Sequence, residues 1–219
     1  MSHVYGKRIL DKHTPSGGNK ILKIQNNQSN TSPHVPNILL VGLTGCGKTT
    51  VGRLLAYYLG WGFLDTDHLV ELVHKDTVTN ILDKNGIKEF RKIEANVLTR
   101  ILAVKNHVIS LGGGALLERS NRARLNQLGT IIWIDVSIQN IAWRFLHIDG
   151  MLAKRPLLWK LENLRDEDVT LRFKAVCDRL DMLLAERISH FNRSKLVVNA
   201  DYLSAEMCAF KIKYLIQNS

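Results

Sequence analysis

Short runs of apolar residues recur along the chain, separated by longer segments in which apolar residues return every three or four positions. Runs of the first kind are typical of buried β-strands, and the second spacing is typical of amphipathic helices. The runs lie at residues 37–41, 62–64, 107–111, 130–136 and 195–199. Because strands that alternate with helices usually form a parallel sheet covered by helices on both faces, the pattern predicts an α/β fold.

Three stripes at helical spacing are predicted to face the core of this fold. They consist of Val51, Leu54, Leu55, Tyr58 and Leu59; of Phe90, Ile93, Val97, Leu98 and Ile101; and of Val169, Phe173, Val176, Leu180, Leu183 and Leu184. The pair Asn85-Gly86 precedes the second stripe and is predicted to separate it from a short preceding helix.

A glycine-rich segment follows the first apolar run directly. Residues 42–49 read Gly-Leu-Thr-Gly-Cys-Gly-Lys-Thr and match the pattern G-x-x-x-x-G-K-[ST] at every fixed position. In such a loop the backbone N–H groups converge on phosphate oxygens, the Lys reaches the outer phosphates and the Thr hydroxyl reaches Mg²⁺. A simple turn is the alternative, but a strand before the loop and a helix after it favour phosphate binding.

Two carboxylates, Asp65 and Asp67, stand where the second predicted strand ends. On a strand, residues two apart point to the same face, and ligands of open α/β sheets bind at the carboxyl ends of the strands. One Asp could then support the Mg²⁺ shell while the other meets a substrate hydroxyl. The alternative, that both Asp residues cap a helix starting near His68, stays open at this point.

Two further features are weaker when taken alone. Arg91 and Glu94 stand three residues apart on a predicted helix, where a solvated pair would contribute only about 0.2 to 0.5 kcal/mol and would carry no function. Gly112, Gly113 and Gly114 follow the third predicted strand, where bare backbone would let a ligand approach closely.

The periodicity lapses in two segments. Residues 1–36 carry five Lys and Arg against one Asp and little apolar sequence, which predicts a flexible basic tail. Residues from about 149 to 166 mix charged and apolar side chains without a helical repeat, and a loop of that length within a domain is usually functional. We predict that this second segment is a lid, and that residues 37–219 form one domain.

Composition narrows the class of protein further. With 219 residues, of which 45% are hydrophobic, the chain can form one sizeable core, and no apolar run is long enough to span a membrane. The net charge of +10 suits small anionic ligands better than nucleic acid, because no stretch interleaves basic residues with aromatic ones.

The three cysteines, an odd number without close spacing, argue against disulfides and a zinc cluster. The cytoplasm is the expected compartment, although the basic tail leaves a transit peptide, as in a plastid protein, open.

Taken together, these motifs resemble those of the shikimate kinases, in the same order along the chain. The resemblance covers residues 37 to about 217 and includes the phosphate loop, Asp65-Thr66-Asp67, Phe90-Arg91 with Glu94, the three glycines and Arg155-Pro156-Leu157-Leu158. It implies a P-loop fold similar to nucleoside-monophosphate kinases, with five parallel strands in the order 2-3-1-4-5. It also implies transfer of a phosphoryl group from ATP, with Mg²⁺, to the 3-hydroxyl of shikimate.

The resemblance also implies a role for each matching residue. The residues implied to bind ATP are Gly42, Thr44, Gly45, Cys46, Gly47, Lys48, Thr49, Thr50, Arg144 and Arg155. Thr49 and Asp65 are implied to hold the metal. The residues implied to bind shikimate are Asp67, Arg91, Gly112, Gly113, Gly114 and Arg187, with Glu94 orienting Arg91. Lys48, Asp67 and the lid residue Arg155 are the implied catalytic residues. Shikimate and ATP are the expected partners of a protein that we expect to be a monomer.

The chain also departs from the family pattern. Arg155 and Arg187 are 32 residues apart, which is longer than usual and implies an insertion, and no Pro follows Pro156 to pack on adenine. Phe191 stands where the family usually has Tyr, and the tail has no counterpart in the minimal family form. Two alternatives remain from the sequence: another small-metabolite kinase of this fold, such as a gluconate or nucleoside-monophosphate kinase, and a non-catalytic binding protein.

Overall fold

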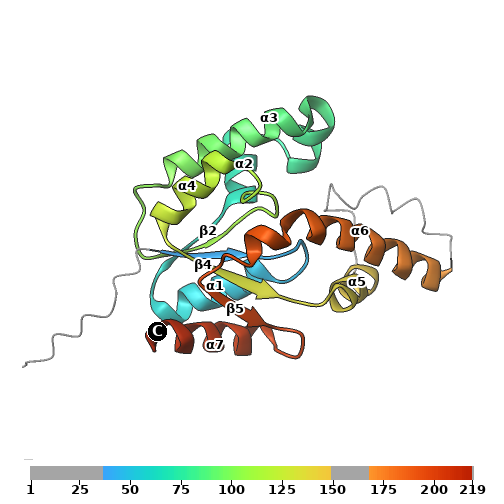
Figure 1. Ribbon diagram of the computed structural model, residues 1–219. Coiled ribbons are helices and arrows are strands. Elements are labelled where there is room, and N and C mark those ends of the chain that lie inside the picture. The colour runs from blue at the N-terminus through green and yellow to red at the C-terminus, as the bar shows by residue number, and fades with distance from the viewer. Residues whose placement is uncertain (1–36, 149–167, 219) are drawn as a thin grey trace, which may run out of the picture. The chain divides into compact units, whose positions relative to one another are not determined.

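Five parallel strands form one sheet in the order β2-β3-β1-β4-β5 in the computed structural model, which describes residues 37–148 and 168–218 (Figure 1). The strands are β1 (Asn37–Val41), β2 (Gly62–Asp65), β3 (His107–Ser110), β4 (Thr130–Asp135) and β5 (Leu196–Asn199). The predicted fold class, the five strands and the order implied by the resemblance are therefore confirmed.

Helices cover both faces of this sheet. They are α1 (Lys48–Leu59), α2 (Thr66–His74), α3 (Val78–Arg100), α4 (Arg119–Leu128), α5 (Ile138–His147), α6 (Val169–Phe191) and α7 (Ala205–Gln217). Figure 1 shows α1 and α7 packed together on one side of the sheet, with α3, α4 and α6 on the other side.

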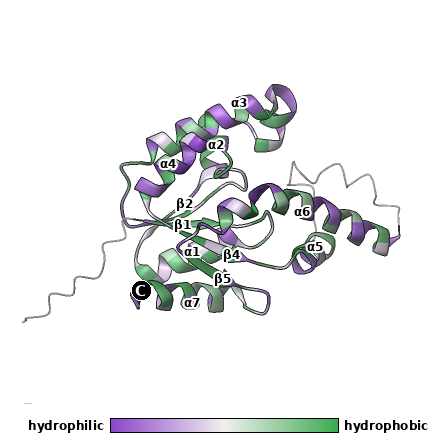
Figure 2. Ribbon diagram, viewed as in Figure 1, coloured by the Kyte–Doolittle hydropathy of each residue, from purple (hydrophilic) through white to green (hydrophobic). Residues whose placement is uncertain are grey.

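The central strand β1 explains why the first apolar run is continuous. It pairs with β3 on one side and with β4 on the other, and all five of its residues are buried. A strand with neighbours on both edges and helices on both faces has no side directed to water, so its side chains do not alternate. In Figure 2 the hydrophobic colour accordingly gathers on the strands, while the hydrophilic colour is prominent on α3 and the outer part of α6.

The predicted stripes are largely confirmed as core. Val51 and Leu55 of the first stripe and Phe90, Val97 and Leu98 of the second are buried. The assignment of Val169, in the third stripe, to the core was wrong, because this residue is 58% exposed. It is the first residue of α6, and the first turns of this helix project beyond the sheet (Figure 1).

The separation predicted at Asn85-Gly86 appears as a kink inside α3. Gly86 has φ 75° and ψ 171°, whereas the residues on both sides are helical. A positive φ is accessible to glycine at little cost because glycine lacks a Cβ atom. The kink divides α3 into a short first segment, Val78 to Asn85, and a longer second segment that carries Phe90, Arg91 and Glu94.

Two expectations lie outside the described residues. These are the basic tail at 1–36 and the lid at about 149–166, which includes Arg155. Among the helices that the structure does describe, none has the length and apolar character needed to cross a bilayer.

Candidate active site

The phosphate loop between β1 and α1 is built on three glycines with positive φ. These angles are 147° at Gly42, 82° at Gly45 and 101° at Gly47. Gly47 occupies the N-cap position of α1 and has no side chain to bond the first free N–H groups of the helix, and no acidic residue lies in the first turn. The first N–H groups of α1 and the positive end of its dipole are therefore left open, which is the arrangement that a phosphate-binding loop requires.

Two cationic side chains reach this loop. The Lys48 ammonium donates hydrogen bonds to the carbonyls of Gly42 and Leu43, both at 2.9 Å. Arg144, near the end of α5, makes longer contacts of 3.4 Å to the carbonyls of Gly45 and Cys46. The structure thus brings Lys48 and Arg144 together at the loop, although they are far apart in sequence.

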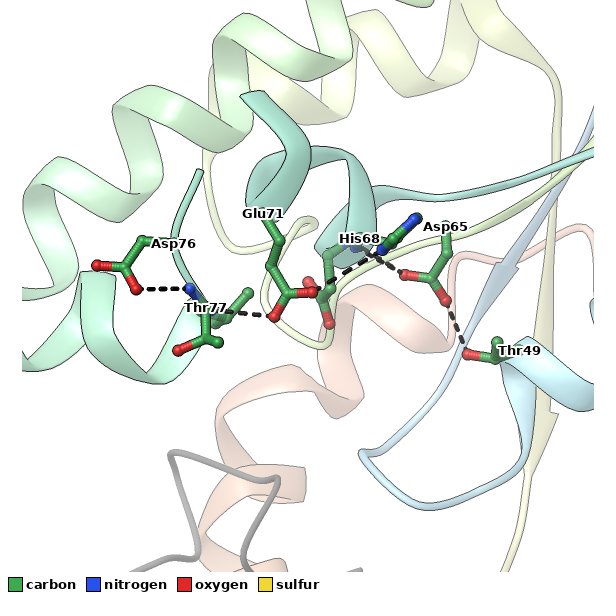
Figure 3. A network of polar contacts seen from close by, with 8 residues as sticks. Thr49, Asp65, His68, Glu71, Asp76 and Thr77 are labelled. Atoms are coloured by element: carbon green, nitrogen blue, oxygen red, sulfur yellow. Dashed lines mark hydrogen bonds and ion pairs between the residues drawn. The ribbon is translucent and has the colours of Figure 1, made fainter. Parts of the chain in front are cut away.

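Asp65 joins the phosphate loop to the start of α2. One carboxylate oxygen accepts a hydrogen bond of 2.7 Å from the Thr49 hydroxyl, and the other accepts from the N–H groups of Asp67 and His68 (Figure 3). The helix-capping interpretation is therefore correct for Asp65, and it is compatible with a metal role because each oxygen has its own task.

A hydroxyl and a carboxylate at this distance fit Mg²⁺, which usually takes few protein ligands and completes its shell with water and phosphate oxygens. Thr49 and Asp65 are the residues that could hold it. No group of three or more His, Cys, Asp or Glu side chains is arranged to hold a metal ion within residues 37–148 and 168–218.

The reason given for pairing Asp65 with Asp67 was wrong, although both line one cavity. β2 ends at Asp65, so Asp67 lies in the first turn of α2 and not on the strand. Alternation along a strand therefore does not set its direction. Asp67 lies instead against Gly112, where a Cβ atom would collide with the Asp67 carboxylate.

Arg91 and Glu94 form an ion pair in which Glu94 is buried and Arg91 is largely covered, so the interpretation as a solvated surface pair is wrong. Their side chains are 15% and 1% exposed, and Arg91 Nη1 lies 2.8 Å from Glu94 Oε2. Burial raises the pKa of Glu94 to about 7, against the opposing effect of Arg91, and the carboxylates of Asp67 and Glu118 add to the rise. Arg91 is thus held by a partner within the protein, which leaves the rest of its guanidinium for a ligand.

The three glycines after β3 make room for these side chains. A Cβ atom on Gly112 would meet Asp67 and Glu94, and one on Gly114 would meet the Arg91 guanidinium. A Cβ atom on Gly113 would meet no atom within 4 Å. We expected bare backbone at all three positions to admit a ligand, whereas at Gly112 and Gly114 it admits protein side chains.

Arg187, on α6, contacts the glycine-rich loop that follows β3 but is not part of the described cavity lining. Its Nε donates a 2.8 Å hydrogen bond to the Gly113 carbonyl, and its Nη1 bonds Glu186 at 2.9 Å and the Leu183 carbonyl. Burial lowers the pKa of this guanidinium, and the charge of Arg91 acts in the same direction. Arg187 is not among the described residues that line the cavities below.

Two adjoining cavities bring the remaining site residues together. The larger, of about 380 Å³, is lined by Thr44, Gly45, Gly47, Lys48, Thr49, Thr50, Arg53, Asp65, Asp67, His68, Glu71, Val78, Ser110, Leu111 and Gly113. The smaller, of about 80 Å³, is lined by Thr44, Asp67, Val78, Leu82, Ile87, Phe90, Arg91, Glu94, Gly113 and Gly114. Four residues belong to both linings, so the phosphate loop and the Arg91–Glu94 pair face one continuous hollow.

Sequence reasoning missed several residues of this wall. His68, Glu71 and Val78 line the larger cavity, and Phe90, assigned to the core, also lines the smaller one. Helical spacing could have indicated Glu71, because it lies one turn after Asp67 on α2 and shares its face.

This arrangement defines a class of protein. P-loop phosphotransferases bind the nucleotide with a phosphate loop and its lysine, and they bind Mg²⁺ with a nearby hydroxyl and carboxylate. This chain has both features, and the pocket beside them contains a guanidinium positioned by an ion pair, which suits a small anionic acceptor. A sequence profile described as shikimate kinase matches residues 44–212. The chain belongs to the shikimate kinase family, and it is an enzyme of the kinase type.

Individual relatives agree with this assignment. A shikimate kinase of Trichormus variabilis is 35% identical over 182 residues, which cover 82% of this chain and 90% of the relative. One from Symbiobacterium thermophilum is 49% identical over 122 residues, covering 56% of this chain and 69% of the relative. The structure of the Acinetobacter baumannii shikimate kinase in complex with shikimate superposes with a TM-score of 0.71 at 32% identity, covering 84% of this chain and 94% of that one.

Proposed function

We propose that the protein transfers the γ-phosphoryl group of ATP to the 3-hydroxyl of shikimate. The observation that carries the proposal is the shared hollow, in which Asp67 and the Arg91–Glu94 pair adjoin the phosphate loop. Phosphoryl transfer requires mainly alignment of the two substrates and neutralisation of the charge on the phosphates. A site that holds an anionic ring next to a triphosphate meets both requirements.

On the nucleotide side, the loop N–H groups and Lys48 bind the β- and γ-phosphates. Arg144 lies beside the loop, where it can contact the nucleotide. Thr49 and Asp65 would hold Mg²⁺, which when bound neutralises charge on the phosphate oxygens. Arg155, which lies outside the described residues, would supply a further positive charge to the transferred group, as the resemblance implies.

On the acceptor side, Arg91 binds the carboxylate of shikimate through two parallel N–H bonds, the geometry that a guanidinium offers a carboxylate. Glu94 holds the other edge of that guanidinium. Asp67 orients the ring hydroxyls and accepts the proton of the attacking one. Gly113 presents its backbone to the ring, and Arg187, bonded to the Gly113 carbonyl, adds positive potential behind it.

The test measures ADP release with a coupled assay, with and without shikimate. We expect ADP release that depends on shikimate, and loss of turnover in Lys48→Ala. ADP release only with gluconate or a nucleoside monophosphate would support a different kinase of this fold. Nucleotide binding without turnover on any acceptor would support a non-catalytic binding protein.

We further propose a cytoplasmic location. All three cysteines lie in the described part of the chain and none forms a disulfide, as is usual in a reducing compartment. Fractionation of the source cells would test it.

A further inference from the structure

Glu71 on α2 holds the start of α3. Its Oε1 accepts a 3.1 Å hydrogen bond from the backbone N–H of Val78, the first residue of α3 (Figure 3). Its Oε2 lies 3.9 Å from Nδ1 of His68, one turn earlier on the same helix. Glu71 thus joins two helices that follow each other through a short turn.

Helix α3 does not need this bond in order to form. The Thr77 hydroxyl accepts from the N–H of Asn80 and caps the helix. Asp76 accepts from the Thr77 N–H and from Asn80 and pairs with Lys84. Ile81 is fully buried in a small cluster with Val70 and Phe90. The bond to Glu71 therefore determines where the helix begins relative to α2, and not whether the helix exists.

The start of α3 is also a wall of the site. Val78 lines both cavities, and Leu82, one turn later, lines the smaller one. Asp67 also lines both cavities and lies on α2, four residues before Glu71. Asp67 and Val78, which both line the cavities, are thus connected by one turn of α2, from Asp67 to Glu71, and by the hydrogen bond from Val78 to Glu71. The kink at Gly86 separates this wall segment from the part of α3 that carries Arg91.

We propose that Glu71 is a positioning residue for the acceptor: through its hydrogen bond to the start of α3 it sets the width of the smaller cavity, in which Arg91 would bind shikimate. The inference rests on the proposed function, because it takes shikimate as the ligand of that cavity. Glu71 acts through Val78 and not by contact with the reacting atoms. Glu71 also lines the larger cavity, but its described contacts are to Val78 and His68 and not to the phosphate loop, Lys48 or the Thr49–Asp65 pair, so we expect ATP binding to be unaffected.

Steady-state kinetics on the full-length protein test the proposal, with shikimate and ATP varied separately. Loss of this bond in Glu71→Ala raises the shikimate KM about tenfold, the effect expected of one hydrogen bond to a charged group. The ATP KM stays at the wild-type value. Glu71→Gln keeps an oxygen that accepts from the Val78 N–H and restores the shikimate KM to within about threefold of the wild type. Glu71→Asp is one methylene shorter, cannot reach Val78 and behaves as Glu71→Ala does.

The matched control is Glu89→Ala, which removes a half-exposed glutamate of α3 that pairs only with Lys92 among the contacts described, and leaves both KM values unchanged. An unchanged shikimate KM in Glu71→Ala overturns the proposal, and so does an equal rise of both KM values. A Glu71→Gln protein that matches Glu71→Ala overturns it too, because charge would then matter more than the hydrogen bond. If Glu71→Ala does not fold, Glu71→Asp and Glu71→Gln decide the question. Failure of the proposed function is distinct, since the wild type would then release no ADP with shikimate.

Discussion

Burial changes the energetics of the Arg91–Glu94 ion pair. On a solvated helix the pair would contribute little, whereas here the Glu94 side chain is 1% exposed and one of its oxygens, Oε1, has no hydrogen-bond partner among the described residues. A buried carboxylate that is only partly paired is costly in its charged form. This cost explains the raised pKa of Glu94.

The first prediction concerns pH and stability. Burial raises the pKa of Glu94 from 4.5 to about 7. Between these values folded Glu94 keeps a proton that the unfolded chain has released, so the free energy of unfolding falls as the pH rises through this window and is level above it. We predict that the wild type loses roughly 1 to 3 kcal/mol relative to Glu94→Gln across the window. Urea denaturation at several pH values measures the difference, and parallel curves for the two proteins would contradict it.

The second prediction concerns recognition of the acceptor carboxylate. Arg91→Lys replaces a planar fork by a point charge, so we predict that the shikimate KM rises at least about tenfold while the ATP KM stays constant. Arg100→Lys, an exposed change on the same helix, is the control. An unchanged shikimate KM would remove Arg91 from the carboxylate site.

Among the secondary-structure elements, one buried side-chain amide ties together the amino-terminal end of the sheet, which is the end opposite the site. Asn37, at the start of β1, is 1% exposed. Its amide nitrogen donates to the carbonyls of Val104 and Leu128, and its oxygen accepts from the His107 N–H. One side chain therefore satisfies backbone groups that three other segments leave free at their ends.

We predict that Asn37→Ala lowers the free energy of unfolding by about 2 to 4 kcal/mol, because the three hydrogen bonds of a buried amide are lost together. Turnover by the folded variant stays at the wild-type level, since Asn37 is at the amino end of β1 and the site is at the carboxyl end. Chemical denaturation and kinetics measure both effects, with the exposed Asn126→Ala on α4 as control. A stable variant with low turnover would show the opposite of what we expect.

At the scale of the whole molecule, the site is assembled from the ends of several elements. The described residues that line the two cavities all lie between Thr44 and Gly114. They come from the phosphate loop, the ends of β2 and β3, and helices α1, α2 and α3. The acceptor and nucleotide sites therefore share one framework, to which α5 and α6 add Arg144 and Arg187.

Removal of residues 1–36 is predicted to leave kcat and both KM values within about twofold of the full-length protein, because the shikimate kinase profile matches only residues 44–212 and the described lining of both cavities begins at Thr44. The comparison uses the coupled ADP assay on both proteins, with melting temperatures to confirm equal folding. A large rise in the shikimate KM of the shortened chain would assign the tail a part in catalysis.

Much of this structure follows from local patterns. The five strands, the phosphate loop on α1 and the break at Gly86 could be predicted because each depends on residues that are neighbours in sequence. The direction of Asp67 was predicted for the wrong reason, because the end of β2 could not be told from the start of α2 by spacing alone. The exposure of Val169 was missed because a stripe does not tell where a helix leaves the sheet.

The order and kind of the elements and the presence of the phosphate-binding loop follow from the sequence, since periodicity and loop geometry are properties of short segments. The burial of Glu94 in its pair with Arg91, the room that Gly112 and Gly114 make for side chains and the contact between Glu71 and α3 follow only from the tertiary structure. These features depend on distances between α2, α3 and the loop after β3. Segments so far apart in the chain acquire defined distances only when the sheet has brought them to one edge.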